Sequence, residues 1–63
     1  MQPPIPYALL ETIGVESLTN GHLLKKNVAL EIIAALLRDK GEAWIRDNLE
    51  TVRETITSVT GVL

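Results

Sequence analysis

The 63-residue chain contains no cysteine and no phenylalanine, and its only aromatic side chains are Tyr7 and Trp44. Without cysteine, the fold can have neither disulfides nor zinc sites that need thiolates, and the single His22 cannot form a histidine cluster. A domain of about 60 residues buries only about 60% of the surface that its unfolded chain exposes. Domains this small usually depend on disulfides, a metal or a second subunit, so we expect support from association and no metal or cofactor.

Strong charge of either sign is also missing, because eight acidic and six basic residues give a net charge of −2. Nucleic-acid binding depends mainly on Lys and Arg, so this balance does not favour it. No apolar run reaches the roughly 20 residues needed to span a bilayer, and the first residues do not have the pattern of a signal peptide. Together with the lack of cysteine, these features predict a soluble, cytoplasmic protein with no membrane partner.

Three prolines stand among the first six residues, which predicts an extended arm over 1–6. A single helical domain is expected over 7–61. Its first helix is predicted over about 7–14, because Pro6 suits a helix start and Gly14 suits a helix end. A helix of two turns is marginal in isolation, so this one has to be docked.

A loop is predicted over 15–22, between the first helix and a long helix over about 20–38. Thr19 and Asn20 are both residues that commonly cap the start of a helix. Asn20 is followed by glycine, which is typical of a turn. The long helix is therefore expected to begin at this point.

The helix over 20–38 is apolar on several sides. Every residue from 28 to 37 is aliphatic except Glu31. At about 100° per residue, the polar residues of its later turns form a stripe only about 40° wide, made of Asn27, Glu31 and Arg38. Such a pattern is typical of a central helix and not of a surface helix.

A third helix is predicted over about 42–59, after a break at Gly41. Asp39 and Glu42 have the spacing of a capping box, although one kinked helix through Gly41 is an alternative. The apolar residues of this helix are spaced 4, 3, 4, 3, as in a heptad repeat; they are Ile45, Leu49, Val52, Ile56 and Val59. The opposite face is expected to be solvated and carries Arg46, Asp47, Glu50, Arg53, Glu54 and Thr57.

The sequence therefore predicts an all-α fold, with a short helix and a long antiparallel helical hairpin. The heptad helix can cover one side of the helix over 20–38, and the short helix can cover part of another. A remaining apolar strip is expected to bind a second copy of the chain in a four-helix core, since two-fold dimers are the commonest oligomers. The predicted interface residues are Val28, Leu30, Ile32, Ile33, Leu36 and Leu37.

No arrangement of residues indicates catalysis. His22 has no nucleophile or acid at a useful spacing, the carboxylates after residue 41 suggest a solvated face, and the four glycines are isolated. We therefore expect a non-enzymatic protein that binds a protein partner in a regulatory or adaptor role. Trp44 and Tyr7 are the candidate contact residues, because aromatic side chains are common at interface hot spots; Trp44 could instead cover the interhelical turn.

Two other functions remain open from the sequence. One is a small dimeric DNA-binding regulator of the helix-turn-helix kind, with Lys25, Lys26 and Arg38 as its basic residues. Against it, the helix that would enter the DNA groove is very apolar, and the predicted loop is longer than the usual three or four residues. The other is a structural subunit of a larger assembly.

Overall fold

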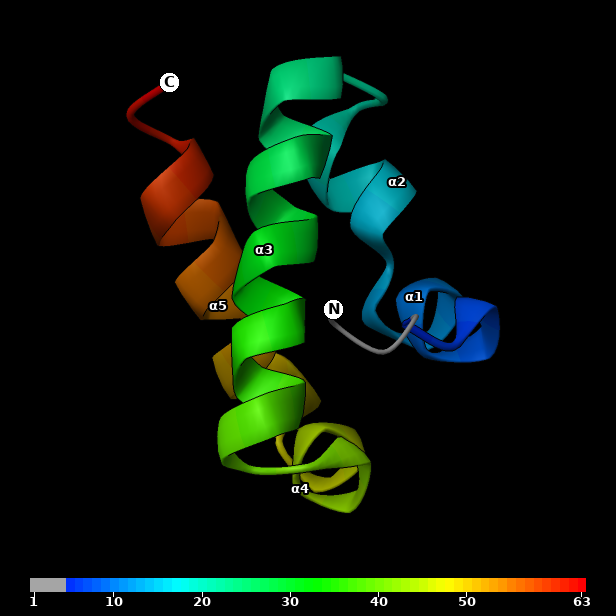
Figure 1. The fold of residues 1–63 in the computed structure, drawn as a ribbon. Coiled ribbons are helices and arrows are strands. Elements are labelled where there is room, and N and C mark those ends of the chain that lie inside the picture. The colour runs from blue at the N-terminus through cyan, green and yellow to red at the C-terminus, as the bar shows by residue number, and fades with distance from the viewer. Residues whose placement is uncertain (1–4) are drawn as a thin grey trace.

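The computed structural model describes residues 5–63, and this part of the chain is helical apart from its turns (Figure 1). The all-α prediction is confirmed. The helices are α1 (Tyr7–Ile13), α2 (Val15–Thr19), α3 (Leu23–Asp39), α4 (Glu42–Asp47) and α5 (Leu49–Thr60). The predicted extended arm over 1–6 falls mostly outside the described residues.

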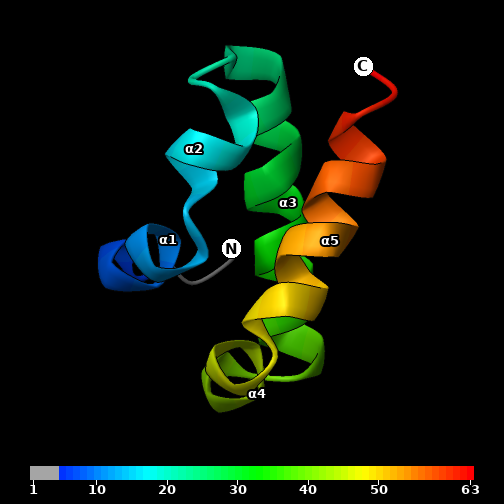
Figure 2. The same ribbon diagram turned by 180° about the vertical axis from the view of Figure 1, so that it is seen from behind.

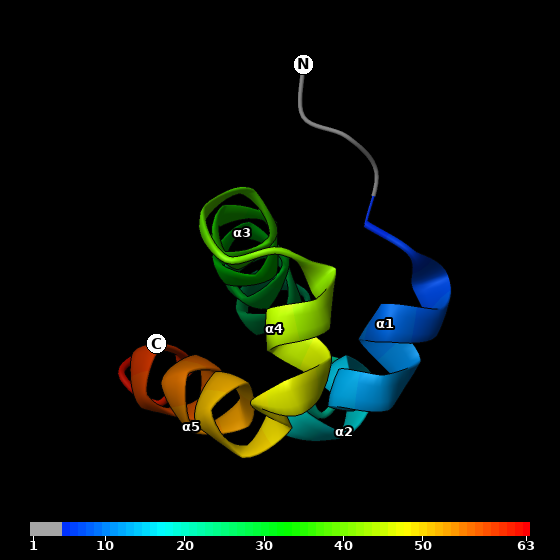
Figure 3. The ribbon, with the colours of Figure 1, turned by 90° about the horizontal axis from the view of Figure 1, so that it is seen from below.

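The long helices α3 and α5 lie side by side and run in opposite directions (Figures 1 and 2). The short α4 joins them across one end, and α1 and α2 pack on the side that faces the groove between them (Figure 3). The molecule measures 27 × 26 × 19 Å. Within one chain, α3 thus contacts α2, α4 and α5 on its inner side.

Every helix contributes to the buried core, which is aliphatic. Its members are Leu9, Ile13, Val15, Ala29, Ile33, Ile45, Val52 and Ile56. From α3, only Ala29 and Ile33 are fully buried, because these two lie one turn apart on its inner side. The other aliphatic residues of α3 are half-buried or exposed, so the chain leaves much of this apolar helix uncovered.

The loop predicted over 15–22 is wrong, since Val15–Thr19 forms α2. Gly14 has a left-handed backbone, with φ at 84°, which ends α1 and lets the chain restart as a helix in a new direction. The Thr19 hydroxyl is buried and donates a 2.8 Å hydrogen bond to the Val15 carbonyl oxygen. Asn20, with φ at 50°, then ends α2. The connection to α3 is therefore only the turn over residues 20–22.

The predicted start of the long helix is also corrected. Thr19 belongs to α2 and Asn20 ends that helix, so neither caps α3. His22 does so instead, with its Nδ1 accepting a 3.5 Å hydrogen bond from the Lys25 backbone N–H. The histidine is exposed and satisfies one of the free N–H groups that every helix start leaves.

The connection between α3 and α4 is a sharp turn. Gly41 has φ at 97° and ψ at 164°, a conformation open almost only to glycine, so a single kinked helix is ruled out. The capping box predicted from Asp39 and Glu42 does not form, because Gly41 is the residue before α4 and no side chain caps that helix.

The helix predicted over 42–59 is interrupted at Asn48. The Asn48 side-chain amide donates a 2.8 Å hydrogen bond to the Trp44 carbonyl oxygen, so it occupies an acceptor at the end of α4. The chain therefore changes direction between α4 and α5. Val59, the last predicted seam residue, is 43% exposed, whereas Thr60 is buried. An unsupercoiled helix has 3.6 residues per turn, so its buried side drifts away from a strict heptad pattern.

Candidate functional site

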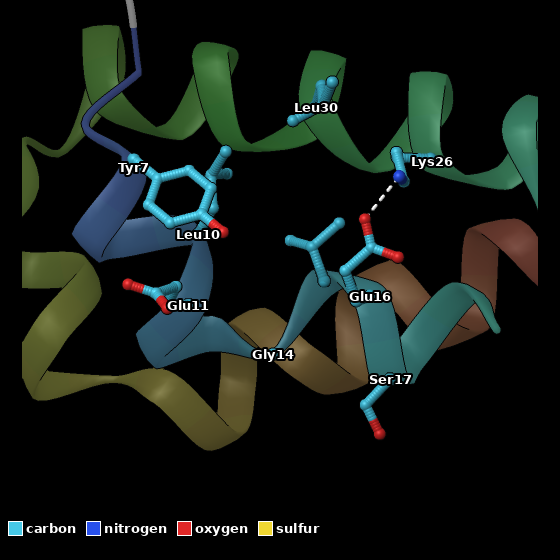
Figure 4. Close-up of a pocket in the computed structure, with 9 residues that line it drawn as sticks. Tyr7, Leu10, Glu11, Gly14, Glu16, Ser17, Lys26 and Leu30 are labelled. Atoms are coloured by element: carbon cyan, nitrogen blue, oxygen red, sulfur yellow. Dashed lines mark ion pairs between the residues drawn. The ribbon is translucent and has the colours of Figure 1, made fainter. Parts of the chain in front are cut away.

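A cleft lies between α1, α2 and α3, with a volume of about 480 Å³ (Figure 4). It arises because α1 packs against α2, α4 and α5 and leaves α3 uncovered opposite it. The residues that line it are Tyr7, Leu10, Glu11, Gly14, Val15, Glu16, Ser17, Lys26 and Leu30.

The interior of this cleft is mainly apolar. Val15 is buried, and Leu10 and Leu30 are half-buried on opposite walls. Tyr7 lies beside Leu10 at one end, and 74% of its surface is exposed (Figure 4). A large aromatic ring left this open contributes little to the core, and it offers an apolar surface and a hydroxyl to a bound molecule.

Charged groups stand at the rim of the cleft. Glu16 of α2 and Lys26 of α3 form an ion pair across its end away from Tyr7 (Figure 4). Glu11 of α1 is exposed on the near side. Since Glu16 and Lys26 are both partly open to water, their pair contributes at most about 1 kcal/mol to stability. The rim is acidic overall, with one lysine and two carboxylates.

Arg53 of α5 holds the α1 wall of the cleft in place. Its Nε and Nη2 donate hydrogen bonds of 2.8 Å to the carbonyl oxygens of Ile13 and Thr12, at the end of α1. A third bond, of 3.2 Å, goes from Nη1 to the Glu50 carboxylate. The predicted solvated position of Arg53 is thus wrong. Helix spacing alone could not reveal this contact, because its partners are 40 and 41 residues away.

The two predicted contact aromatics lie in different places. Tyr7 lines the cleft, whereas Trp44 is half-buried at α4 and packs partly against the core. The Lys40 ammonium lies 5.7 Å from the centre of the Trp44 ring, within cation–π range. Trp44 therefore covers the turn that joins α3 to α4, the alternative considered from the sequence.

The six predicted interface residues do not share one surface. Ile33 is fully buried in the core of the single chain, so it cannot reach a second copy and is removed from the set. Leu30 lines the cleft. Ile32, Leu36 and Leu37 are half-buried and pack partly against the core. Val28 is half-buried as well, and it is not among the residues that pack against the core.

The candidate nucleic-acid residues are dispersed. Lys26 is engaged with Glu16, and Lys25 is half-buried. Arg38 is exposed, but it lies 13 residues from Lys25, or about 20 Å along the helix axis. However, the turn between α2 and α3 has three residues, so its length is compatible with a helix-turn-helix motif.

No group of three or more acidic or histidine side chains in residues 5–63 is arranged to hold a metal ion. None of the helices in that range has the length and hydrophobicity that crossing a membrane requires. Comparison with known protein families, curated proteins and solved structures finds no match. The cleft therefore has to be interpreted from its own geometry and chemistry.

Proposed function

We propose that the protein is a small, non-enzymatic homodimer that binds a protein partner in the cytoplasm, in a regulatory or adaptor role, and that the cleft is its partner site. The observation that carries the proposal is the open apolar cleft with Tyr7 at its edge. Tyrosine is one of the residues most enriched at interface hot spots.

The shape and lining of the cleft favour a segment of another protein. An amphipathic helix binds to such a groove by inserting apolar side chains at a spacing of three or four residues. Leu10 and Leu30 would contact such an apolar side chain, and Glu11 is placed to pair with a Lys or Arg beside it. The partner segment we expect is therefore apolar on one side and basic at its edge.

A photo-crosslinking residue in place of Tyr7 tests this function directly in cells that express the protein. We expect one adduct with a defined partner, which disappears when Leu30→Asp is added. Thr57, an exposed residue of α5 that does not line the cleft, gives the matched control position. Identical adducts from positions 7 and 57 would refute a partner site in the cleft.

Affinity for the captured partner gives the second measurement. Tyr7→Ala is expected to weaken binding about tenfold or more, as truncation of an aromatic hot spot does. Thr57→Ala should leave the affinity within about twofold, because exposed residues outside an interface contribute little. Equal effects of the two substitutions would place the partner elsewhere.

Dimerisation is the second part of the proposal. It is supported by the 46% hydrophobic composition, which exceeds what a core of eight buried residues uses. Leu23 and Leu24 at the start of α3 are 71% and 54% exposed. Burial of further apolar surface would stabilise a domain whose own core is small.

DNA binding is retained as a second candidate because of the short turn between α2 and α3. Three residues containing a glycine form the usual connection in a helix-turn-helix motif. Titration with duplex DNA at two salt concentrations decides this: tight binding that falls steeply with salt supports it, and no binding at low salt excludes it.

A further inference from the structure

A second seam runs along α3, beside its buried side. It consists of Lys25, Val28, Ile32, Ala35 and Asp39, which we call the α3 seam. The spacing of these residues is 3, 4, 3, 4, as in the contact positions of a coiled coil. At about 100° per residue, all five lie within about 80° of one another. The middle of the seam is apolar, and its two ends carry opposite charges.

The α3 seam and the cleft residues of α3 lie on opposite sides of the buried face of this helix. Measured around the helix from the buried Ile33, the cleft residues Lys26 and Leu30 lie about 20° and 60° to one side. The seam lies about 80° to 160° to the other side of the helix. The partner site and the seam can therefore be occupied independently.

The seam is accessible and its charges are unpaired within residues 5–63. Val28, Ile32 and Lys25 are half-buried, while Ala35 and Asp39 are exposed. The ion pairs of the described residues involve other side chains.

The charges of the seam complement themselves. Lys25 and Asp39 each lie seven residues from Ile32, about 21 Å apart along the helix. In an antiparallel pair of α3 helices with a two-fold axis at Ile32, Lys25 of each copy faces Asp39 of the other. Val28 then lies within one residue of the position opposite Ala35 of the other copy. Two-fold symmetry thus makes every charged contact of the seam attractive.

A different occupant would fit this pattern less well. An anionic lipid surface would attract Lys25 and repel Asp39 equally, so the seam has no net affinity for it. A foreign antiparallel helix would need a base toward its N-terminus and an acid toward its C-terminus, at the same separation. The chain itself meets that condition.

We propose that two copies of the protein associate antiparallel across the α3 seam, with reciprocal Lys25–Asp39 pairs at the ends of the contact and Ile32 at its centre. The inference rests on the homodimer of the proposed function and specifies its interface. It replaces the interface predicted from the sequence, of which only Val28 and Ile32 lie on the seam.

Charge reversal tests the register, with sedimentation at micromolar concentrations as the readout. Lys25→Glu and Asp39→Lys each turn two attractive contacts into two repulsive ones, so each should raise the dimer Kd at least tenfold, or about 1.4 kcal/mol. The double variant restores opposite charges and should return the Kd to within about threefold of the parent value. Arg38→Glu, on α3 but about 100° away from Asp39, is the control and should change little.

A single cysteine gives an independent test, because the chain has none of its own. Ile32→Cys places its thiol next to the same thiol of the other copy, so mild oxidation should yield a covalent dimer. Leu24→Cys lies eight residues from the axis and should couple poorly.

The possible failures are distinguishable. The interface lies elsewhere if neither charge reversal changes the dimer Kd and the Leu24→Cys variant couples as fast as the Ile32→Cys variant. That result would overturn this inference alone. A chain that stays monomeric up to millimolar concentrations would overturn the homodimer of the proposed function as well. Circular dichroism of each variant confirms that the helices are intact.

Discussion

Replacing Arg53 by methionine tests how α1 is held in place. Methionine keeps most of the length of the side chain and has a similar helix propensity, so the backbone of α5 should be unaffected. The substitution removes two hydrogen bonds from the guanidinium to the last carbonyl groups of α1. Those carbonyl groups also form the negative end of the helix, where a cation is favourable.

The expected loss is about 2 kcal/mol. A hydrogen bond to a charged group contributes about 1.5–3 kcal/mol when it is protected from water. Here the bond to Ile13 involves a buried residue, whereas Thr12 is exposed and the Arg53 side chain is 35% exposed, so water compensates in part. At about 0.05–0.15 kcal/mol per residue, the whole chain has about 3–9 kcal/mol of stability. The single contact thus accounts for a large share of it.

Thermal unfolding followed by circular dichroism measures this loss. A change of about 2 kcal/mol in a domain of this size should lower Tm by about 8–16 °C. Hydrogen exchange should accelerate first in Tyr7–Ile13, because that helix loses its attachment. Arg53→Lys should recover only part of the stability, since one ammonium cannot reproduce the two-pronged geometry of the guanidinium.

Arg46→Met is the matched control, because Arg46 is exposed and pairs only with Glu42, at 3.0 Å within α4. We expect that change to cost about 0.2–0.5 kcal/mol. If Arg53→Met and Arg46→Met differ by less than about 0.5 kcal/mol, the bonds to α1 give no net stability and the reasoning is refuted.

Two further comparisons test the backbone and the core. Gly14→Ala and Gly41→Ala both place a Cβ in open space, so the loss in free energy of unfolding reports backbone conformation alone. By urea denaturation we expect a loss of about 1 kcal/mol at Gly14 and up to about 3 kcal/mol at Gly41. Equal losses would contradict the assigned backbone conformations. Ile33→Ala should lower the free energy of unfolding by about 2–5 kcal/mol and unfold much of the protein. Ile32→Ala should mainly weaken dimerisation. If Ile32→Ala instead unfolds the protein and Ile33→Ala weakens the dimer, α3 is rotated about its axis.

The sequence predicted the helices where local signals agree with the tertiary structure. Gly14 and Gly41 end helices as expected, since the backbone at both positions requires glycine. The aliphatic run of α3 predicted a central helix, and α3 does contact α2, α4 and α5. These features depend on short-range chemistry that the order of residues states directly.

The breaks within helical stretches could not be predicted in the same way. Asn48 interrupts the third predicted helix through a bond to Trp44, and nothing in the heptad spacing distinguishes this asparagine from a solvated one. Likewise, Gly14 suggested an end of helix but not that α2 would begin in the next residue. Both cases turn on a backbone angle at one residue, and tertiary packing selects that angle.

The cleft was also beyond the reach of the sequence, because it depends on where α1 is anchored. Arg53 ties the end of α1 to α5, and α1 also packs against α2 and α4 but not against α3. The long-range contact of one arginine therefore helps to position the α1 wall of the cleft.

The apolar character of α3 has a different explanation from simple burial. One side, at Ala29 and Ile33, forms the core, a second side lines the cleft, and a third carries the α3 seam. A dimer across the seam would leave the two clefts open on the outer faces of the pair. Such a dimer could hold two copies of a partner segment, and linkage of the two sites would raise the avidity for a bivalent partner without any new contact. The excess of aliphatic residues would then serve three contacts, of which a single chain satisfies only the first.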